Sequence, residues 1–79
     1  MEHRDQMILK RVGRNLAAER ARRDLTQEQV ADRMGVQVTQ YSRMEQGRTD
    51  SGITKYLKAA WAIGMTPNEL LRKLEDRMP

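Results

Sequence analysis

Apolar residues recur three or four positions apart along most of the chain, a spacing that places them on one face of an α-helix. Glycines and short polar segments separate these runs, and no run alternates between apolar and polar residues as a half-buried strand would. The pattern predicts helices over residues 6–23, 27–34, 38–46, 53–63 and 67 to about 78. We therefore expect a compact all-α, five-helix domain spanning residues 1–79, with its packed core between about residues 6 and 76.

The ends of these helices carry capping residues. Thr26 followed by Gln29, and Thr66 followed by Glu69, fit the capping box, in which two side chains bond the free backbone amides at the start of a helix. Pro67 stands at the first position of the last helix, where its missing N–H costs nothing. Three helices are expected to end at a glycine: Gly35, Gly47 and Gly64.

The predicted helices carry apolar residues at helical spacing. These are Leu9, Val12 and Leu16 on one face of the first helix, Val30 and Ala31 on the second, and Leu70, Leu71 and Leu74 on the last. The core face of the fourth helix is expected to be Ile53, Leu57, Ala60 and Ile63. Gly13 stands beside the first face, although a glycine within a helix costs about 1 kcal/mol relative to alanine. Close packing of a second helix against Gly13 is one explanation.

The third helix differs from the others in what it leaves outside. Val38, Tyr41 and Met44 fall three residues apart and share one face, with the Tyr41 hydroxyl expected at its rim. The other side chains of this segment form hydrogen bonds: Gln37, Thr39, Gln40, Ser42, Arg43, Glu45 and Gln46. These groups predict a surface that binds a polar partner.

The 79 residues are 38% apolar and 33% charged, with a net charge of +4. Arginine outnumbers lysine, and residues 1–25 alone carry seven bases against four acids. An arginine-rich surface suits the binding of phosphate by planar guanidinium groups, although a GC-rich genome would also explain the arginine content. The positive charge favours an anionic partner.

The composition also excludes several classes of protein. The chain has no cysteine, which excludes disulfides and thiolate metal sites, and we expect no cofactor and no metal. No apolar run approaches the roughly 20 residues that span a bilayer, and the polar start MEHRDQ is unlike an export signal. We expect a cytoplasmic, nucleoid-associated protein. An enzyme is not expected, because no nucleophile motif surrounds Ser51, the one serine that His3 and Asp50 would complete as a triad.

Residues 20–48, RARRDLTQEQVADRMGVQVTQYSRMEQGR, resemble the helix-turn-helix of the phage Cro and repressor family of small bacterial regulators. That family shows an arginine before a TQ pair, an apolar–alanine pair, a GV pair and an S-x-apolar-E-x-G ending. The chain matches this pattern with Arg20, Thr26-Gln27, Val30-Ala31, Gly35-Val36 and residues 42–47. The resemblance continues to about Leu74 and implies a lambda-repressor-like fold, in which the second and third helices form the helix-turn-helix.

The resemblance also implies a role for the polar surface of the third helix. In the family this helix lies in the major groove of duplex DNA, where its side chains touch base edges. The positions that match the base-reading residues, or lie beside them, are Val38, Thr39, Gln40 and Arg43. Phosphate contacts are implied for Gln27, Gln37, Gln46 and Arg48. Arg43 would bond O6 and N7 of a guanine, a contact that contributes about 1–3 kcal/mol of discrimination.

Other residues are expected to serve stability or assembly. The resemblance implies an internal salt bridge between Arg20 and Glu45 that ties the first helix to the end of the third. The arginines that follow Arg20 are interpreted as a solvated helix end, with direct DNA contact as the alternative. Candidates for a homodimer surface are Trp61, Leu71, Leu74 and Met78, and packing of Trp61 along the last helix is an equal alternative.

Together these features predict a transcriptional regulator that binds duplex DNA sequence-specifically, as a homodimer on a palindromic operator. Short members of the family include controllers of restriction–modification operons, phage switch proteins and antitoxins. The alternative is an adaptor, antiactivator or antitoxin module that uses the same fold mainly to bind another protein. The zero net charge of residues 26–49 supports this alternative, whereas Gln27, Gln37, Thr39 and Arg43 argue against it.

Overall fold

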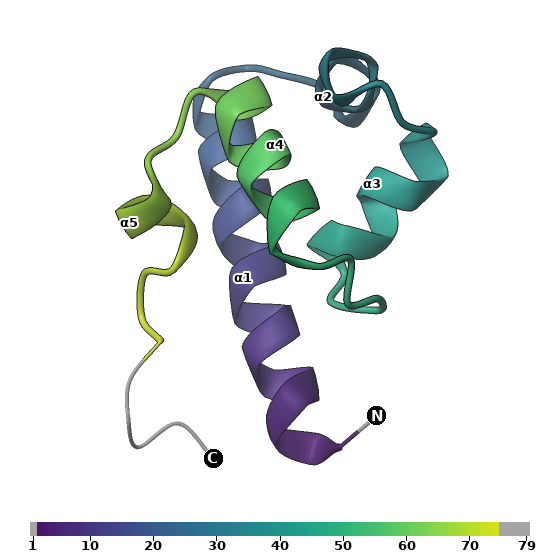
Figure 1. Ribbon diagram of the computed structural model, residues 1–79. Helices are drawn as coiled ribbons and strands as arrows, with labels where there is room; N and C mark the ends of the chain where they lie inside the picture. The colour runs from purple at the N-terminus through teal and green to yellow at the C-terminus, as the bar shows by residue number, and fades with distance from the viewer. Residues whose placement is uncertain (1, 75–79) are drawn as a thin grey trace.

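The computed structural model describes residues 2–74. Its helices are α1 (His3–Arg22), α2 (Gln27–Met34), α3 (Val38–Glu45), α4 (Ile53–Ile63) and α5 (Pro67–Leu70), and this part of the chain contains no strand. Figure 1 shows α1 as the long axis of the molecule, with α4 alongside it, α2 and α3 to one side and α5 to the other. The all-helical fold predicted from the sequence is confirmed.

Local capping explains where the short helices begin and end. The Thr26 hydroxyl accepts a hydrogen bond from the Gln29 amide at 3.0 Å, and the Gln29 side chain accepts one from the Thr26 amide at 2.8 Å. Thr66 and Glu69 form the same reciprocal pair at the start of α5, at 3.1 and 2.8 Å. Gly35 ends α2 with a φ of +73°, a conformation that only glycine adopts without steric cost. Both predicted capping boxes are confirmed.

A single cluster of buried side chains joins all the helices. Its members are Leu9, Val12, Leu16, Val30, Ala31, Tyr41, Met44, Tyr56, Ala59, Ala60, Ile63, Met65 and Leu70. The predicted core position of Ile53 is wrong, because its side chain is 64% exposed. Ile53 begins α4 and lies one and two turns before Leu57 and Trp61, on a side of the helix where Leu57 is half-buried and Trp61 exposed.

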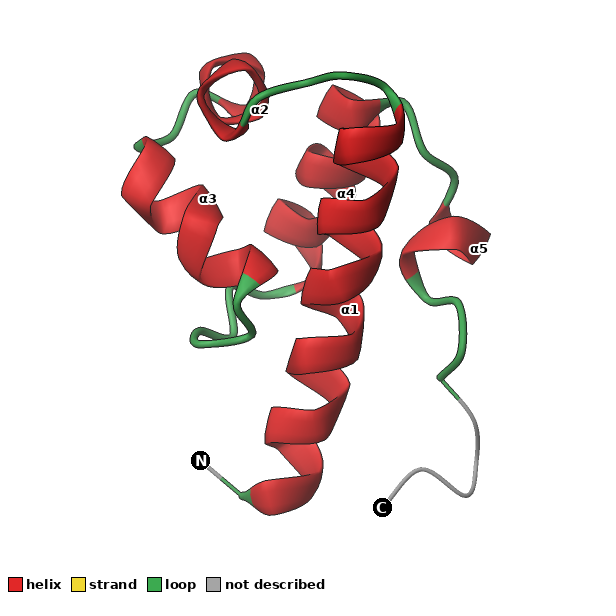
Figure 2. Cartoon of the chain, turned by 180° about the vertical axis from the view of Figure 1, so that it is seen from behind, coloured by secondary structure: helices red, strands yellow, loops and turns green. Residues whose placement is uncertain are grey.

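The first helix begins earlier than the apolar pattern predicts. The side chain of Glu2 accepts a hydrogen bond from the Arg4 amide at 3.0 Å, so the polar segment before the apolar stripe is capped and helical. Figure 2 shows the result: the N-terminal part of α1 extends past the point where α3 ends.

The last helix ends earlier than predicted. The side-chain amide of Asn15, on α1, donates hydrogen bonds of 2.9 Å to the carbonyl oxygens of Leu70 and Arg72. Lys73 then takes a φ of +65°, which is incompatible with a continuing α-helix. The helix therefore stops at Leu70, and Leu71 is exposed. Met78, which the pattern placed at the far end of this helix, lies outside the described residues.

Gly13 is where α1 meets the end of α3, so the close packing suggested by the sequence is present. A Cβ atom on this residue would lie 2.6 Å from the carbonyl oxygen of Met44 and closer still to that of Glu45. We expect Gly13→Ala to destabilise the protein, because overpacking costs about 1–3 kcal/mol and exceeds the helix-propensity gain of about 1 kcal/mol. Urea unfolding followed by circular dichroism measures the change. The control is Ala18→Gly on the exposed side of α1, which reports helix propensity alone; a stabilised Gly13→Ala protein would contradict the close contact.

Candidate nucleic-acid interface

The turn between α2 and α3 is tight and sets the angle of the two helices. Gly35 takes the left-handed conformation, and the Val36 amide donates to the carbonyl oxygen of Ala31 at 3.0 Å. Gln37 then precedes α3 as its N-cap, without a hydrogen bond from its side chain to the helix. Its exposed amide therefore lies beside the free backbone N–H groups at the start of α3, where an anion is stabilised.

The two faces of α3 are sharply different. Tyr41 and Met44 are fully buried, and Val38 is half-buried against the same core, so the predicted shared face is confirmed. On the opposite face Thr39, Arg43 and Gln46 are exposed, and their spacing of four and three residues aligns them in one row. The side chain of Arg43 forms no hydrogen bond or ion pair with any other described residue.

The four residues predicted to read bases therefore divide into two pairs. Thr39 and Arg43 lie on the exposed face of α3, whereas Val38 and Gln40 are half-buried at its borders. A helix presented in this way offers the guanidinium of Arg43 and the hydroxyl of Thr39 on an exposed surface. Val38 is left with only part of its side chain for contact with a thymine methyl.

The residues predicted to bind phosphate also fall into two groups, which differ in exposure. Gln46 and Arg48 are exposed directly after α3 and weakly linked, since the Arg48 guanidinium donates to the Gln46 side-chain oxygen at 3.4 Å. Gln27 is placed differently: it is half-buried, and its side-chain nitrogen donates to Glu45 at 2.8 Å. One of the two N–H groups of Gln27 is thus already engaged inside the protein.

Glu45 is the centre of a polar network beneath α3. Its side chain is 6% exposed and accepts hydrogen bonds from Nε of Arg20 at 2.6 Å and from Nη2 at 3.2 Å. Gln27 and the Tyr41 hydroxyl donate to the same carboxylate. Arg20 also donates to the Leu25 carbonyl oxygen at 2.8 Å. The network joins α1, the start of α2 and the length of α3, and it buries the Tyr41 hydroxyl that the sequence placed at the rim.

The network also changes the ionisation of its members. Burial acts to raise the pKa of Glu45, but the hydrogen bonds from Arg20, Tyr41 and Gln27 and the charge of Arg20 outweigh it and hold that pKa below its usual value. The pKa of Arg20 is raised, chiefly by its hydrogen bond to Glu45. Burial and the bond to Glu45 raise the pKa of Tyr41, so its hydroxyl stays protonated and donates. The carboxylate remains charged at neutral pH.

A second group of ion pairs holds α5 against α1. Glu19 is almost fully buried and pairs with Arg23 at 2.7 Å, Arg22 at 3.3 Å and Arg72 at 3.6 Å. Glu69, on α5, lies 3.8 Å from Arg22. Arg22 is solvated, as expected for a helix end, with its side chain 64% exposed. Arg23 is half-buried instead, and the buried carboxylate of Glu19 engages both arginines. The spacing of Glu19 three and four residues before them is the signal in the sequence.

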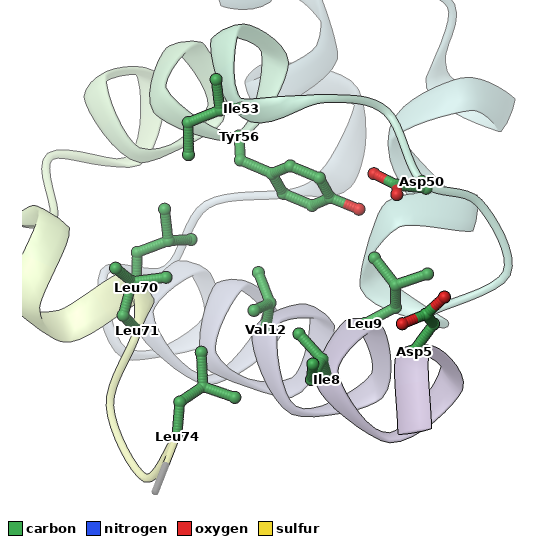
Figure 3. Close-up of a pocket in the computed structure, with 10 residues that line it drawn as sticks. All are labelled: Asp5, Ile8, Leu9, Val12, Asp50, Ile53, Tyr56, Leu70, Leu71 and Leu74. Atoms are coloured by element: carbon green, nitrogen blue, oxygen red, sulfur yellow. The ribbon is translucent and has the colours of Figure 1, made fainter. Parts of the chain in front are cut away.

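The sequence argues against a triad of His3, Asp50 and Ser51, and the structure places His3 and Asp50 in different hollows. His3 lines a hollow on α1, whereas Asp50 lines a separate groove between α1, α4 and the segment after α5. Figure 3 shows this groove, with Asp5 and Asp50 at one end and the leucines of residues 70–74 at the other. Its volume is about 320 Å³, and its walls are mostly apolar.

The candidates for a dimer surface lie on two neighbouring regions. Leu71 and Leu74 line the groove of Figure 3, where Leu71 is 46% exposed and Leu74 half-buried. Trp61 is 69% exposed and lies outside this groove, in a hollow beside Arg33 of α2. Ile53 connects the two regions, because it lines the groove and also shares the outer side of α4 with Trp61. The exposure of Trp61 excludes its packing within the core of a single copy.

The chain resembles known proteins in both sequence and structure. A family model described as a helix-turn-helix domain matches residues 11–74. The solved structure of the restriction-modification controller protein C.AhdI from Aeromonas hydrophila superposes with a TM-score of 0.74 at 29% sequence identity, over 78% of this chain and 94% of that one. No curated protein matches the sequence. Among the described residues, no helix is long and apolar enough to cross a membrane.

Proposed function

The chain belongs to the helix-turn-helix family of DNA-binding regulators, and on that premise we propose that it binds one duplex sequence as a homodimer and thereby controls transcription. The observation that carries the proposal is the exposed row of Thr39, Arg43 and Gln46 on α3. The guanidinium of Arg43 engages no other described residue, while Glu45 beneath it fixes the helix to α1 and α2. A rigid helix with an unengaged fork suits direct readout in a major groove.

In this proposal Arg43 bonds a guanine, and Thr39 bonds a base edge or touches a thymine methyl. Val38 and Gln40 contribute from the borders of the helix. Gln37 at the start of α3, and Gln46 and Arg48 after its end, hold the backbone on either side and set the register. Gln27 acts mainly through Glu45, with its remaining amide group left for a phosphate.

Dimerisation follows from the small number of base-reading residues in one copy. Two copies on a two-fold site, with half-sites about 34–36 Å apart, double the contacts. The outer side of α4 supplies the surface: Ile53 and Trp61 are the two most exposed large apolar side chains of the described residues, and Leu71 continues the surface into the groove. A second copy of the chain is the occupant that we propose.

A controller of a restriction–modification operon is the member of the family that we favour, because of the likeness to C.AhdI. A phage switch protein or an antitoxin would use the same interface. The alternative from another class remains the adaptor module, in which the exposed apolar side of α4 binds a different protein and α3 is not used. The two are separated by whether α3 discriminates between sequences.

Selection from a random duplex library, followed by titration of the enriched duplex at several salt concentrations, tests the proposal. We expect a palindrome with half-sites about one helical turn apart and an affinity that falls linearly in log salt. Weak binding without sequence preference would reject the regulator and favour the adaptor.

Replacing Arg43 with alanine is expected to weaken discrimination at one base pair by about 1–3 kcal/mol, because the bidentate contact with guanine is lost. Competition titrations with operators changed at single base pairs measure the loss. Arg43→Lys is the matched control, since it keeps the charge without the planar fork. It should lose discrimination while binding to unrelated duplex is retained. Full discrimination in both variants would remove Arg43 from base readout.

A further inference from the structure

The N-terminal half of α1 carries a basic surface that the proposed interface does not use. His3, Met7, Lys10, Arg11 and Arg14 line a hollow of about 260 Å³ on this helix. Within residues 2–74, none of the three bases Lys10, Arg11 and Arg14 forms an ion pair. The arginines at the other end of α1 are all paired with acids, so the two halves of this helix differ in whether their bases form ion pairs.

Arg11 supplies a second observation at the same place. Its Nε atom is buried and has no hydrogen-bond partner in the described part of the chain. A buried donor without an acceptor costs free energy, and a flexible guanidinium that turns toward an anion in the hollow would recover the bond. An acceptor in the hollow would lie beside three cationic side chains, which favour one that carries a negative charge.

The nearby acids do not neutralise this hollow. The side chain of Glu2 is engaged at the helix start, where it accepts from the Arg4 amide. Asp5 lines the apolar groove of Figure 3, which contains none of the residues of the basic hollow. The positive charge of the hollow thus faces solvent, with no acidic side chain of residues 2–74 along its walls.

The position of the hollow connects it to α3. A Cβ atom on Gly47 would lie 2.7 Å from the Cα atom of Lys10, so the backbone of α1 touches the chain just after α3. Gln46 and Arg48, the proposed phosphate contacts, flank Gly47. Figures 1 and 2 show that the N-terminal end of α1 extends past the α3–α4 loop. Residues 3–10 also precede the part of the chain that the family model matches.

The geometry points to a second phosphate-binding surface: Lys10, Arg11 and Arg14 hold the DNA backbone beside the half-site read by α3. The row of contacts would run from Arg48 across Lys10 to Arg14. This inference rests on the proposed binding of duplex DNA. The contacts would add affinity but no sequence specificity, because phosphates are the same at every base pair.

The test compares two double variants that each remove two positive charges. Lys10→Gln with Arg14→Gln removes the exposed bases of the hollow, and Lys55→Gln with Lys73→Gln removes the same charge elsewhere. The slope of log affinity against log salt should fall by about 0.9 for each lost phosphate contact in the first variant. At 0.1 M salt this amounts to roughly eightfold weaker binding per contact. The control should keep the slope of the unmodified protein.

Two further arms separate this inference from the proposed function. The enriched sequence should be the same for the unmodified protein and the Lys10/Arg14 variant, and the difference between them should disappear on a duplex that ends flush with the half-sites. Equal slopes for the two double variants would overturn the inference while leaving the regulator intact. If no sequence is preferred, the regulator fails, and the same slope comparison on an arbitrary duplex still decides whether the hollow binds phosphate. Urea unfolding of each variant checks that the fold is retained.

Discussion

Replacing Glu45 with glutamine is expected to lower the free energy of unfolding by about 3–5 kcal/mol, the cost of breaking a buried ion pair from one side. The amide cannot accept from Arg20, Gln27 and Tyr41 together, and it leaves the Arg20 guanidinium without a counter-charge at a site that is only 20% exposed. Since the free energy of unfolding of an ordinary domain is about 5–15 kcal/mol, the loss should be visible as a large shift of the urea midpoint. Glu28→Gln, on the exposed surface of α2, is the matched control and should change stability little.

The same variant gives the sign of the pH dependence. The pKa of Glu45 is lowered in the folded protein, so its contribution is complete above the unfolded value of about 4.3. It is lost as the pH falls through the lower folded value. The difference in unfolding free energy between the unmodified protein and Glu45→Gln should therefore be constant near neutral pH and shrink in acid. A difference that grew in acid would contradict the charged, hydrogen-bonded carboxylate.

The helix boundaries that sequence alone predicts correctly are those set by local chemistry. Thr26 with Gln29, and Thr66 with Glu69, satisfy backbone amides within four residues of themselves, so their effect does not depend on the rest of the fold. The end of α5 was not predictable in this way. It is set by the Asn15 amide, which binds the Leu70 carbonyl oxygen from 55 residues away.

The site shows the same division between local pattern and tertiary contact. The spacing of α3 predicts which side chains are buried, and Arg20 and Glu45 were identified through the family pattern. The convergence of Gln27 and the Tyr41 hydroxyl on that carboxylate depends on how α2 and α3 meet, which no periodicity encodes. The sequence predicts a core position for Ile53 because it shares the helical spacing of Leu57, Ala60 and Ile63. Only the packing of α4 against its neighbours reveals that it faces outward.

That outward position gives Ile53 its value as a probe of the dimer. Its side chain is 64% exposed in one copy, so a polar replacement loses little buried area on folding. Leu74, by contrast, is half-buried and packs against the core, so a charged residue there would disturb folding and assembly together. A stable interface buries about 800 Å² on each partner, and a tryptophan alone supplies about 150–250 Å². Trp61, with Ile53 and Leu71 beside it, is a suitable centre.

Ile53→Arg is therefore expected to yield folded monomers, because a charge within an apolar interface is desolvated without a partner. Two copies would then bind an operator independently, and the gain from linking two modules, about 10²–10⁴ in affinity, would be lost. Sedimentation gives the oligomeric state, and titration of full and half operators gives the affinity. Asn68→Arg adds the same charge on the exposed start of α5 and should leave both unchanged. A dimeric Ile53→Arg protein would remove the outer side of α4 from the interface. A monomer with full operator affinity would mean that DNA binding does not need the dimer.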